Sequence, residues 1–197
     1  MTTISPRDLS KGQLLSLVLK CSDFAAKKHK RQKRMDKEGT PYINHPLGVA
    51  NILTEEGDVH DPVVILSAIL HDTVEDTETT FEEIEREFGS EVKLVVSEVT
   101  DDKTLPKMER KQLQIDHSPH ISHEAKLVKL ADKIYNLRDL RKEIPVGWTA
   151  ERAHEYFKWA EQVIQGCRGT NERLEAILDE IFASEKMEHE KMLKKSA

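Results

Sequence analysis

Apolar residues recur at helical spacing along most of the 197-residue chain, which favours helices packed around one core. The first such face consists of Leu14, Leu17, Val18, Cys21 and Ala25. Glycine (8) and proline (7) are both scarce, which disfavours the many turns of an all-β protein. We therefore predict an all-α fold of roughly eight to ten helices of ordinary length. Residues 97–104 are the one stretch where a short β-hairpin also fits the sequence.

Local signals divide the chain into helical segments. Asp61-Pro62 is a capping residue followed by a proline, which predicts a helix start, and the run 63–70 is apolar on every side, as in a helix buried all round. Further helices are predicted over 47–53, 81–88, 92–99, 106–115, 126–140, 149–165 and 171–182. Residues 1–183 are expected to form a single domain. The mostly charged residues 184–197 are expected to form a tail, as frayed or extended helix.

Charge and cysteine content narrow the function classes. With 30 Lys+Arg against 36 Asp+Glu, the formal charge is −6, which disfavours a nucleic-acid binder because neutralising phosphates needs a basic surface. The basic run 27–34 lacks interleaved aromatic residues, so we interpret it as a solvated helix end that helps to steer a polyphosphate. No segment reaches the apolar length that a bilayer requires, so no membrane partner is expected. The two cysteines fit reduced thiols in the cytoplasm.

The strongest chemical signal is the dipeptide His71-Asp72 at the end of the buried apolar run. A buried, unpaired carboxylate is costly, so such a group is usually paired with a cation or bound to a metal. Glu75 and Asp76 follow closely, and in a continued helix they would stack on His71 and Asp72. Three acidic groups at one helix end repel one another, and a divalent cation relieves that repulsion.

Two further residues complete a set of metal ligands. His45 stands at a proline-bracketed helix start, and Asp132 lies in an apolar helix that offers no other evident reason for a carboxylate. The predicted ligands are His45, His71, Asp72 and Asp132. This mixed set suits Mn²⁺, Fe²⁺ or Zn²⁺, and the acidic neighbours favour Mn²⁺. Taken singly, His45 also fits a helix cap, His71 a satisfied core histidine, and Asp132 a partner of Lys129 or Lys133.

The strings around these residues resemble a known family. The order His45, His71-Asp72, Asp132 resembles the HD-domain superfamily of metal-dependent phosphohydrolases. The strings 39–46 (GTPYINHP), 70–77 (LHDTVEDT) and 129–138 (KLADKIYNLR) are similar to the hydrolase domain of the RelA/SpoT alarmone enzymes. The similarity spans roughly residues 10–183 and leaves no length for a synthetase region, so the chain resembles the stand-alone hydrolases of that family.

The resemblance implies hydrolysis of the 3′-pyrophosphate of guanosine 3′,5′-bis(diphosphate), ppGpp, to GDP and pyrophosphate, with Mn²⁺ bound by the four predicted ligands. It also implies that Glu75 and Asp76 are the catalytic acidic pair, which would take a proton from the attacking water or orient it. The implied substrate contacts are Tyr42, Asn136, Arg34, Lys107, Arg152 and Tyr156. The family's basic residue before the Pro-Tyr motif falls on Met35 here, and Arg34 or Lys33 is the expected substitute.

Two alternatives to ppGpp hydrolysis stay open. Another ribose-phosphorylated nucleotide such as NADPH, losing its 2′-phosphate to give NADH, resembles the alarmone because it also carries a phosphorylated ribose. The second alternative is a non-catalytic HD domain that only binds a nucleotide. The complete set of predicted metal ligands and acidic residues argues against it. A deoxynucleotide or cyclic-nucleotide hydrolase is disfavoured by the strings around Tyr42 and Asn136. In every case the expected partner is a small-molecule nucleotide.

Overall fold

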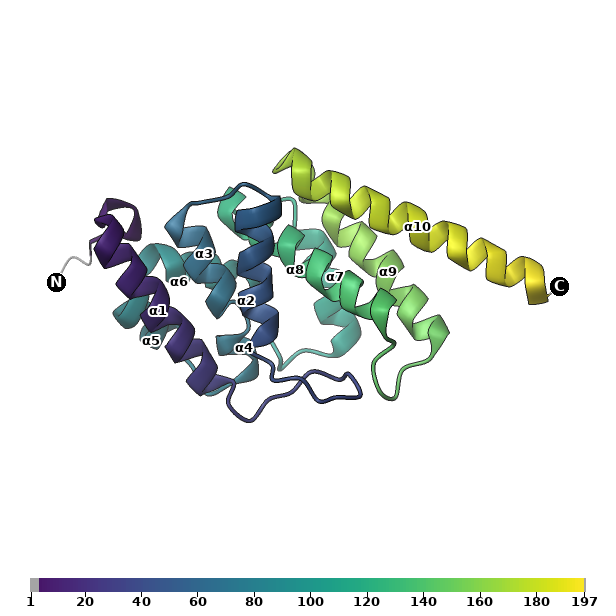
Figure 1. The fold of residues 1–197 in the computed structure, drawn as a ribbon, viewed down its shortest axis with the longest axis horizontal. Coiled ribbons are helices and arrows are strands. Elements are labelled where there is room, and N and C mark those ends of the chain that lie inside the picture. Colours follow the sequence, from purple (N-terminus) through teal and green to yellow (C-terminus); the bar gives the residue numbers. More distant parts are fainter. Residues whose placement is uncertain (1–3, 197) are drawn as a thin grey trace.

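The computed structural model describes residues 4–196, with side chains described as far as residue 191, and confirms the predicted all-α fold (Figure 1). The helices are α1 (Lys11–Lys28), α2 (Asn44–Asn51), α3 (Pro62–Leu70), α4 (Thr73–Asp76), α5 (Phe81–Phe88), α6 (Ser90–Val99), α7 (Lys107–His117), α8 (His123–Lys142), α9 (Ala150–Gln165) and α10 (Glu172–Ser196). A 3-10 turn precedes α1, and a short π-helical turn, Ile52–Glu56, extends α2. Within the described range, no helix is both long and apolar enough to cross a bilayer.

Capping residues start these helices where the sequence predicts. Asp61 accepts a 2.8 Å hydrogen bond from the backbone N–H of Val63, and Pro62 occupies the first turn of α3, where its missing N–H costs nothing. Thr80 caps α5 in the same way. That helix ends at Gly89, whose φ of 96° is one that glycine adopts without strain.

The buried helix α3 lies at the centre of the core, between α1, α2, α6 and α8. Leu66, Ala68 and Leu70 are fully buried in it. α2 approaches α8 closely because Gly48 has no side chain: a Cβ at this position would lie 2.1 Å from the Tyr135 ring. This packing places the end of α3, the start of α2 and the middle of α8 next to one another.

The structure decides two open points about secondary structure, the possible hairpin at 97–104 and the end of the last helix. The hairpin alternative at 97–104 is wrong: Val99 ends α6, because the buried face formed by Val92, Val95 and Val96 continues to it, and the loop that follows contains no described strand. The last helix continues past residue 182, in line with the expectation of an extended helix for the tail. This helix, α10, runs through the charged segment, held by hydrogen bonds such as that from Arg141 Nη2 to Ser184 Oγ, 2.8 Å. The domain limit at residue 183 stays a prediction.

Candidate active site

Three helices bring the four predicted metal ligands together. His45 is the second residue of α2, His71 and Asp72 follow α3, and Asp132 lies in the middle of α8. His45 Nε2 lies 3.2 Å from His71 Nε2, 3.4 Å from Asp72 Oδ2 and 3.2 Å from Asp132 Oδ1. Ligand atoms of His45, His71 and Asp72 all lie within 4.8 Å of one another, so these residues could hold a divalent metal. The positions fit the predicted set, while its role as a metal site remains a prediction.

A shell of hydrogen bonds orients these side chains toward a common point. His71 Nδ1 lies 2.7 Å from the carbonyl oxygen of Ala68, which fixes Nδ1 as the donor in the neutral ring and leaves the Nε2 lone pair facing the centre. Tyr42 donates its hydroxyl to Asp72 Oδ2 at 2.7 Å. Asp132 accepts hydrogen bonds from Asn136 Nδ2 at 2.7 Å and Lys133 Nζ at 2.8 Å. The pairing of Asp132 with Lys133 does occur, and it leaves Oδ1 of the carboxylate facing His45.

Opposite charges dominate the electrostatics of the centre. Burial disfavours the charged imidazole, yet Asp72 and Asp132 raise the pKa of His71 well above its ordinary value. Burial likewise disfavours both carboxylates, but His71 and His45 hold the pKa of Asp72 well below its usual range, and Lys133 with the histidines does the same for Asp132. A protonated imidazole therefore balances the carboxylates when no metal is bound.

The acidic pair follows the His71-Asp72 dipeptide on a separate helix turn. The chain does not continue α3 through Asp72; it breaks after Leu70 and restarts as α4, which carries Glu75 and Asp76. Glu75 Oε2 accepts a 3.1 Å hydrogen bond from the backbone N–H of Asp101, and burial raises the pKa of Glu75 to about 7.

Asp76 is held by polar partners from two other segments. It accepts a 2.7 Å hydrogen bond from Gln32 Nε2 and pairs with the Lys103 ammonium. The loop between α6 and α7, which contains Asp101 and Lys103, thus folds over the acidic pair. The sequence marks this loop only as a polar turn, and nothing in its spacing indicates the contact.

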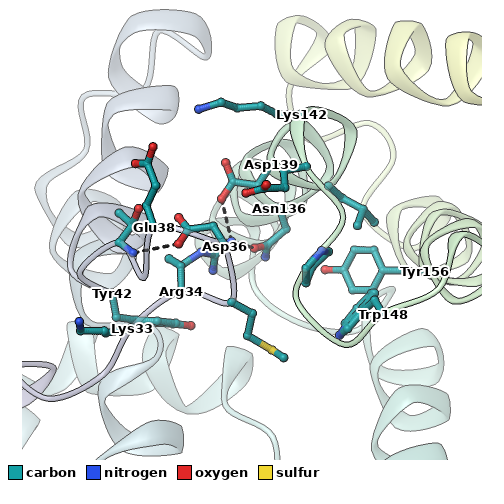
Figure 2. A pocket seen from close by; sticks show the side chains of 15 residues that line it. Lys33, Arg34, Asp36, Glu38, Tyr42, Asn136, Asp139, Lys142, Trp148 and Tyr156 are labelled. Carbon is teal, nitrogen blue, oxygen red and sulfur yellow. Dashed lines mark hydrogen bonds and ion pairs between the residues drawn. The ribbon is translucent and has the colours of Figure 1, made fainter.

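Two cavities meet at this site. The smaller, about 150 Å³, is lined by the four predicted ligands together with Glu75, Lys129 and Lys133, among others. The larger, about 510 Å³, lies between the segment 33–42, the end of α8 and the loop before α9, and Figure 2 shows its side chains. Tyr42 and Asn136 line both cavities. A ligand that reached from one cavity into the other would therefore pass these two side chains.

Four of the predicted substrate contacts line the larger cavity: Tyr42, Asn136, Arg34 and Tyr156. Arg34 Nη2 donates hydrogen bonds of 2.9 Å to both Asn136 Oδ1 and Asp139 Oδ2 (Figure 2). The Arg34 guanidinium also lies over the rings of Tyr42 and Tyr135.

The other two predicted contacts lie outside this lining. Arg152 stacks 4.1 Å above the Trp148 ring, and Lys107 is exposed at the start of α7. Met35 lines the larger cavity beside Lys33 and Arg34, so both expected substitutes for the missing basic residue border it.

Several lining residues were not predicted as site residues, among them one tryptophan and two lysines. Trp148 borders the larger cavity, and Lys129 and Lys133 border the smaller one. The sequence does show lysines on an apolar helix face. It does not show whether such a lysine faces a cavity or pairs with a carboxylate.

Comparison with known proteins places this chain in a family. The model of the HD domain matches residues 21–158. The protein named guanosine-3′,5′-bis(diphosphate) 3′-pyrophosphohydrolase MESH1 in Xenopus tropicalis is 62% identical over 167 residues, which are 85% of this chain and 93% of that protein. The protein of the same name in Homo sapiens is 58% identical over 171 residues, 87% of this chain and 96% of that protein. The chain belongs to the MESH1 family of HD-domain proteins.

A solved structure supports membership of the MESH1 family at the level of the fold. The structure described as a metazoan ortholog of SpoT that hydrolyses ppGpp and plays a role in starvation responses superposes with a TM-score of 0.84 at 50% identity. The superposed region covers 86% of this chain and 95% of the chain in that structure. A second structure, lmo0812 from Listeria monocytogenes, superposes with a TM-score of 0.58 at 30% identity and covers 73% of this chain and 99% of its own.

Proposed function

We propose that this protein is a Mn²⁺-dependent hydrolase that removes the 3′-pyrophosphate of ppGpp, giving GDP and pyrophosphate. The observation that carries the proposal is the convergence of His45, His71, Asp72 and Asp132 on one cavity, with Glu75 on its wall. The activity named for relatives up to 62% identical supports the choice of substrate. The proposed setting is the cytoplasm, where the buried thiols Cys21 and Cys167 stay reduced.

The four proposed ligands supply two imidazole nitrogens and two carboxylates, and this oxygen-rich donor set suits Mn²⁺. When bound, such a metal acts as a Lewis acid on a phosphoryl oxygen and lowers the pKa of water from ~16 toward ~7. The protein's part is to hold the donors in place. Tyr42 orients Asp72 and Asn136 orients Asp132, and the bond between His71 Nδ1 and Ala68 keeps Nε2 of that ring available.

Glu75 is the proposed proton acceptor for the attacking water. Because its pKa is raised to about 7, a substantial fraction is ionised at neutral pH, and the carboxylate is basic enough to accept a proton. Asp76 is proposed to orient the water, since Gln32 and Lys103 hold its carboxylate in one position. General base catalysis of this kind contributes about 10²–10⁴-fold in rate.

The proposed substrate spans both cavities. The 3′-phosphoryl group would lie in the smaller cavity, and the nucleoside in the larger, between Arg34, Trp148 and Tyr156. Lys107 and Arg152 are proposed to contact phosphates at the nucleotide's far end, where cations pair well with phosphate oxygens.

Product analysis tests this function against its rivals. Purified protein is supplied with Mn²⁺ and ppGpp, NADPH or a cyclic nucleotide, each with and without a chelator, and the products are separated by ion-exchange chromatography. We expect pyrophosphate and GDP from ppGpp, abolished by the chelator. Phosphate and NADH from NADPH, with no turnover of ppGpp, would establish the alternative substrate. No turnover of any nucleotide would indicate a binding domain.

A further inference from the structure

Lys129 on α8 is a buried cation that no described residue neutralises. Its side chain is 6% exposed, and it lines the smaller cavity together with the proposed metal ligands. Its neighbour Lys133 is equally buried but pairs with Asp132 at 2.8 Å. Within the described part of the chain, no hydrogen bond or ion pair joins the Lys129 ammonium to another side chain or to the backbone. A buried ammonium without a partner lowers the stability of the fold, so its presence at this position suggests a function.

The nearest carboxylates are already engaged elsewhere. Asp101 and Asp132 attract the Lys129 ammonium, but burial and the charge of Lys133 outweigh them and lower the pKa of Lys129. Asp101 accepts a 2.7 Å hydrogen bond from Gln114 Nε2, and Asp132 is held by Lys133 and Asn136. No protein partner therefore completes the coordination of Lys129, and its open side is the cavity.

The charges that line the smaller cavity indicate which kind of ligand it suits. Lys129 and Lys133 contribute two positive charges to its lining, and Asp72 and Asp132 two negative ones. A divalent cation on the proposed ligands would give the cavity an excess of two positive charges before Glu75 is counted. A phosphate group carries up to two negative charges, so its chemistry matches this excess.

We propose that Lys129 is a further catalytic residue, whose ammonium donates a hydrogen bond to a non-bridging oxygen of the phosphoryl group being hydrolysed. This inference rests on the proposed function. In that reaction the water oxygen bonds to phosphorus, the bond from phosphorus to the 3′-oxygen breaks, and the 3′-oxygen gains a proton. Lys129 keeps its protons throughout and stabilises the negative charge on the phosphoryl oxygens.

The substitution Lys129→Met tests the proposal, because methionine keeps the apolar stem and removes the charge. Binding of inorganic pyrophosphate to the Mn²⁺-loaded protein, measured by calorimetry, should weaken about 10–100-fold, as expected for loss of a hydrogen bond between charged groups. The kcat for ppGpp should fall about 10²–10³-fold. Binding of Mn²⁺ itself should be unchanged, and the Tm should rise because an unpaired buried charge is removed; a purely structural lysine would give a lower Tm.

Two further variants sharpen the result. Lys129→Arg keeps the charge and should retain more pyrophosphate affinity than Lys129→Met, whereas equal losses in both would overturn the proposal. Lys158→Met, on the exposed side of α9, is the matched control and should behave like the wild type. Unchanged pyrophosphate affinity in Lys129→Met would also overturn the role of Lys129. If the wild type binds pyrophosphate but does not hydrolyse ppGpp, the proposed substrate fails while the binding comparison still judges Lys129.

Discussion

The hydroxyl of Tyr42 donates a 2.7 Å hydrogen bond to Asp72 Oδ2, the oxygen that also lies 3.1 Å from His71 Nε2. Tyr42 is therefore a supporting residue of the proposed metal centre as well as part of the lining of the larger cavity. We expect Tyr42→Phe to lower Mn²⁺ affinity about 10-fold, because loss of a supporting hydrogen bond typically costs 10–100-fold. Competition with a chelator of known affinity measures this change.

Tyr135→Phe is the control for that experiment. Its ring also packs against His45, with centroids 4.8 Å apart, but within the described residues its hydroxyl makes no hydrogen bond. This variant should keep the Mn²⁺ affinity of the wild type. Equal effects of the two substitutions would show that aromatic packing, rather than the hydrogen bond to Asp72, supports the centre.

Removal of the metal should destabilise the protein more at high pH than at low pH. In the metal-free protein the pKa of His71 lies well above its ordinary value, which means that protonation stabilises the fold below about pH 6.5. This contribution is lost as the pH rises through the folded-state value, whereas Mn²⁺ takes the place of the proton. The difference in Tm between Mn²⁺-loaded and chelator-treated protein should therefore grow from pH 6 to pH 9. A difference independent of pH would contradict this linkage.

Glu75→Gln should stabilise the metal-free protein above neutral pH. The carboxyl of Glu75 ionises near 4.5 in the unfolded chain and at about 7 in the folded protein, so its ionisation progressively destabilises the fold as the pH rises from 4.5 to 7. The neutral amide avoids that cost, and the gain should be about 1–3 kcal/mol at pH 8 and close to zero at pH 4. Urea unfolding at the two pH values measures it, with the exposed Glu180→Gln as the control. A gain of the same size at both pH values would argue against the raised pKa.

Gly48→Ala should disturb the site through the helix packing. The new Cβ would lie 2.1 Å from the Tyr135 ring, so the ring or the two helices must shift, which disturbs the packing that holds His45 beside Asp132. We expect a loss of about 1–3 kcal/mol in the free energy of unfolding, together with weaker Mn²⁺ binding. Gly12→Ala, which meets nothing within 4 Å in α1, should stabilise the protein slightly. If Gly48→Ala left the free energy of unfolding and the Mn²⁺ affinity unchanged, the close contact between α2 and α8 would not be needed to position the proposed ligands.

Most of the fold could be predicted because helix signals are local. The Asp61-Pro62 start and the Gly89 stop both depend on residues within one turn of the helix end. The hairpin alternative failed because the residues of 97–104 also tolerate a strand, and only packing against the core makes Val99 helical. The sequence left open whether the charged end of α10 is frayed or helical, because that end is held by contacts with α8 and α9 that are distant in sequence.

The candidate site was predictable only in part. The acidic residues after α3 and the carboxylate of Asp132 stand out in the sequence because their neighbours are apolar. His45 and Asp132 could be predicted as metal ligands only with the resemblance to a family. The folding of the 100–106 loop over Glu75 and the cavity-facing position of Lys129 depend on tertiary packing. No spacing rule in the sequence encodes either of them.

Release of pyrophosphate from ppGpp by the wild type and by Asp72→Asn tests the central claim most directly. Both proteins are stripped of metal, reconstituted with Mn²⁺, and checked for folding by circular dichroism. We predict that the wild type releases one pyrophosphate per GDP formed, and that Asp72→Asn keeps the helical fold but loses turnover, since a neutral amide cannot replace the carboxylate ligand. Equal turnover by the two proteins, or no pyrophosphate from the reconstituted wild type, would contradict the proposed function.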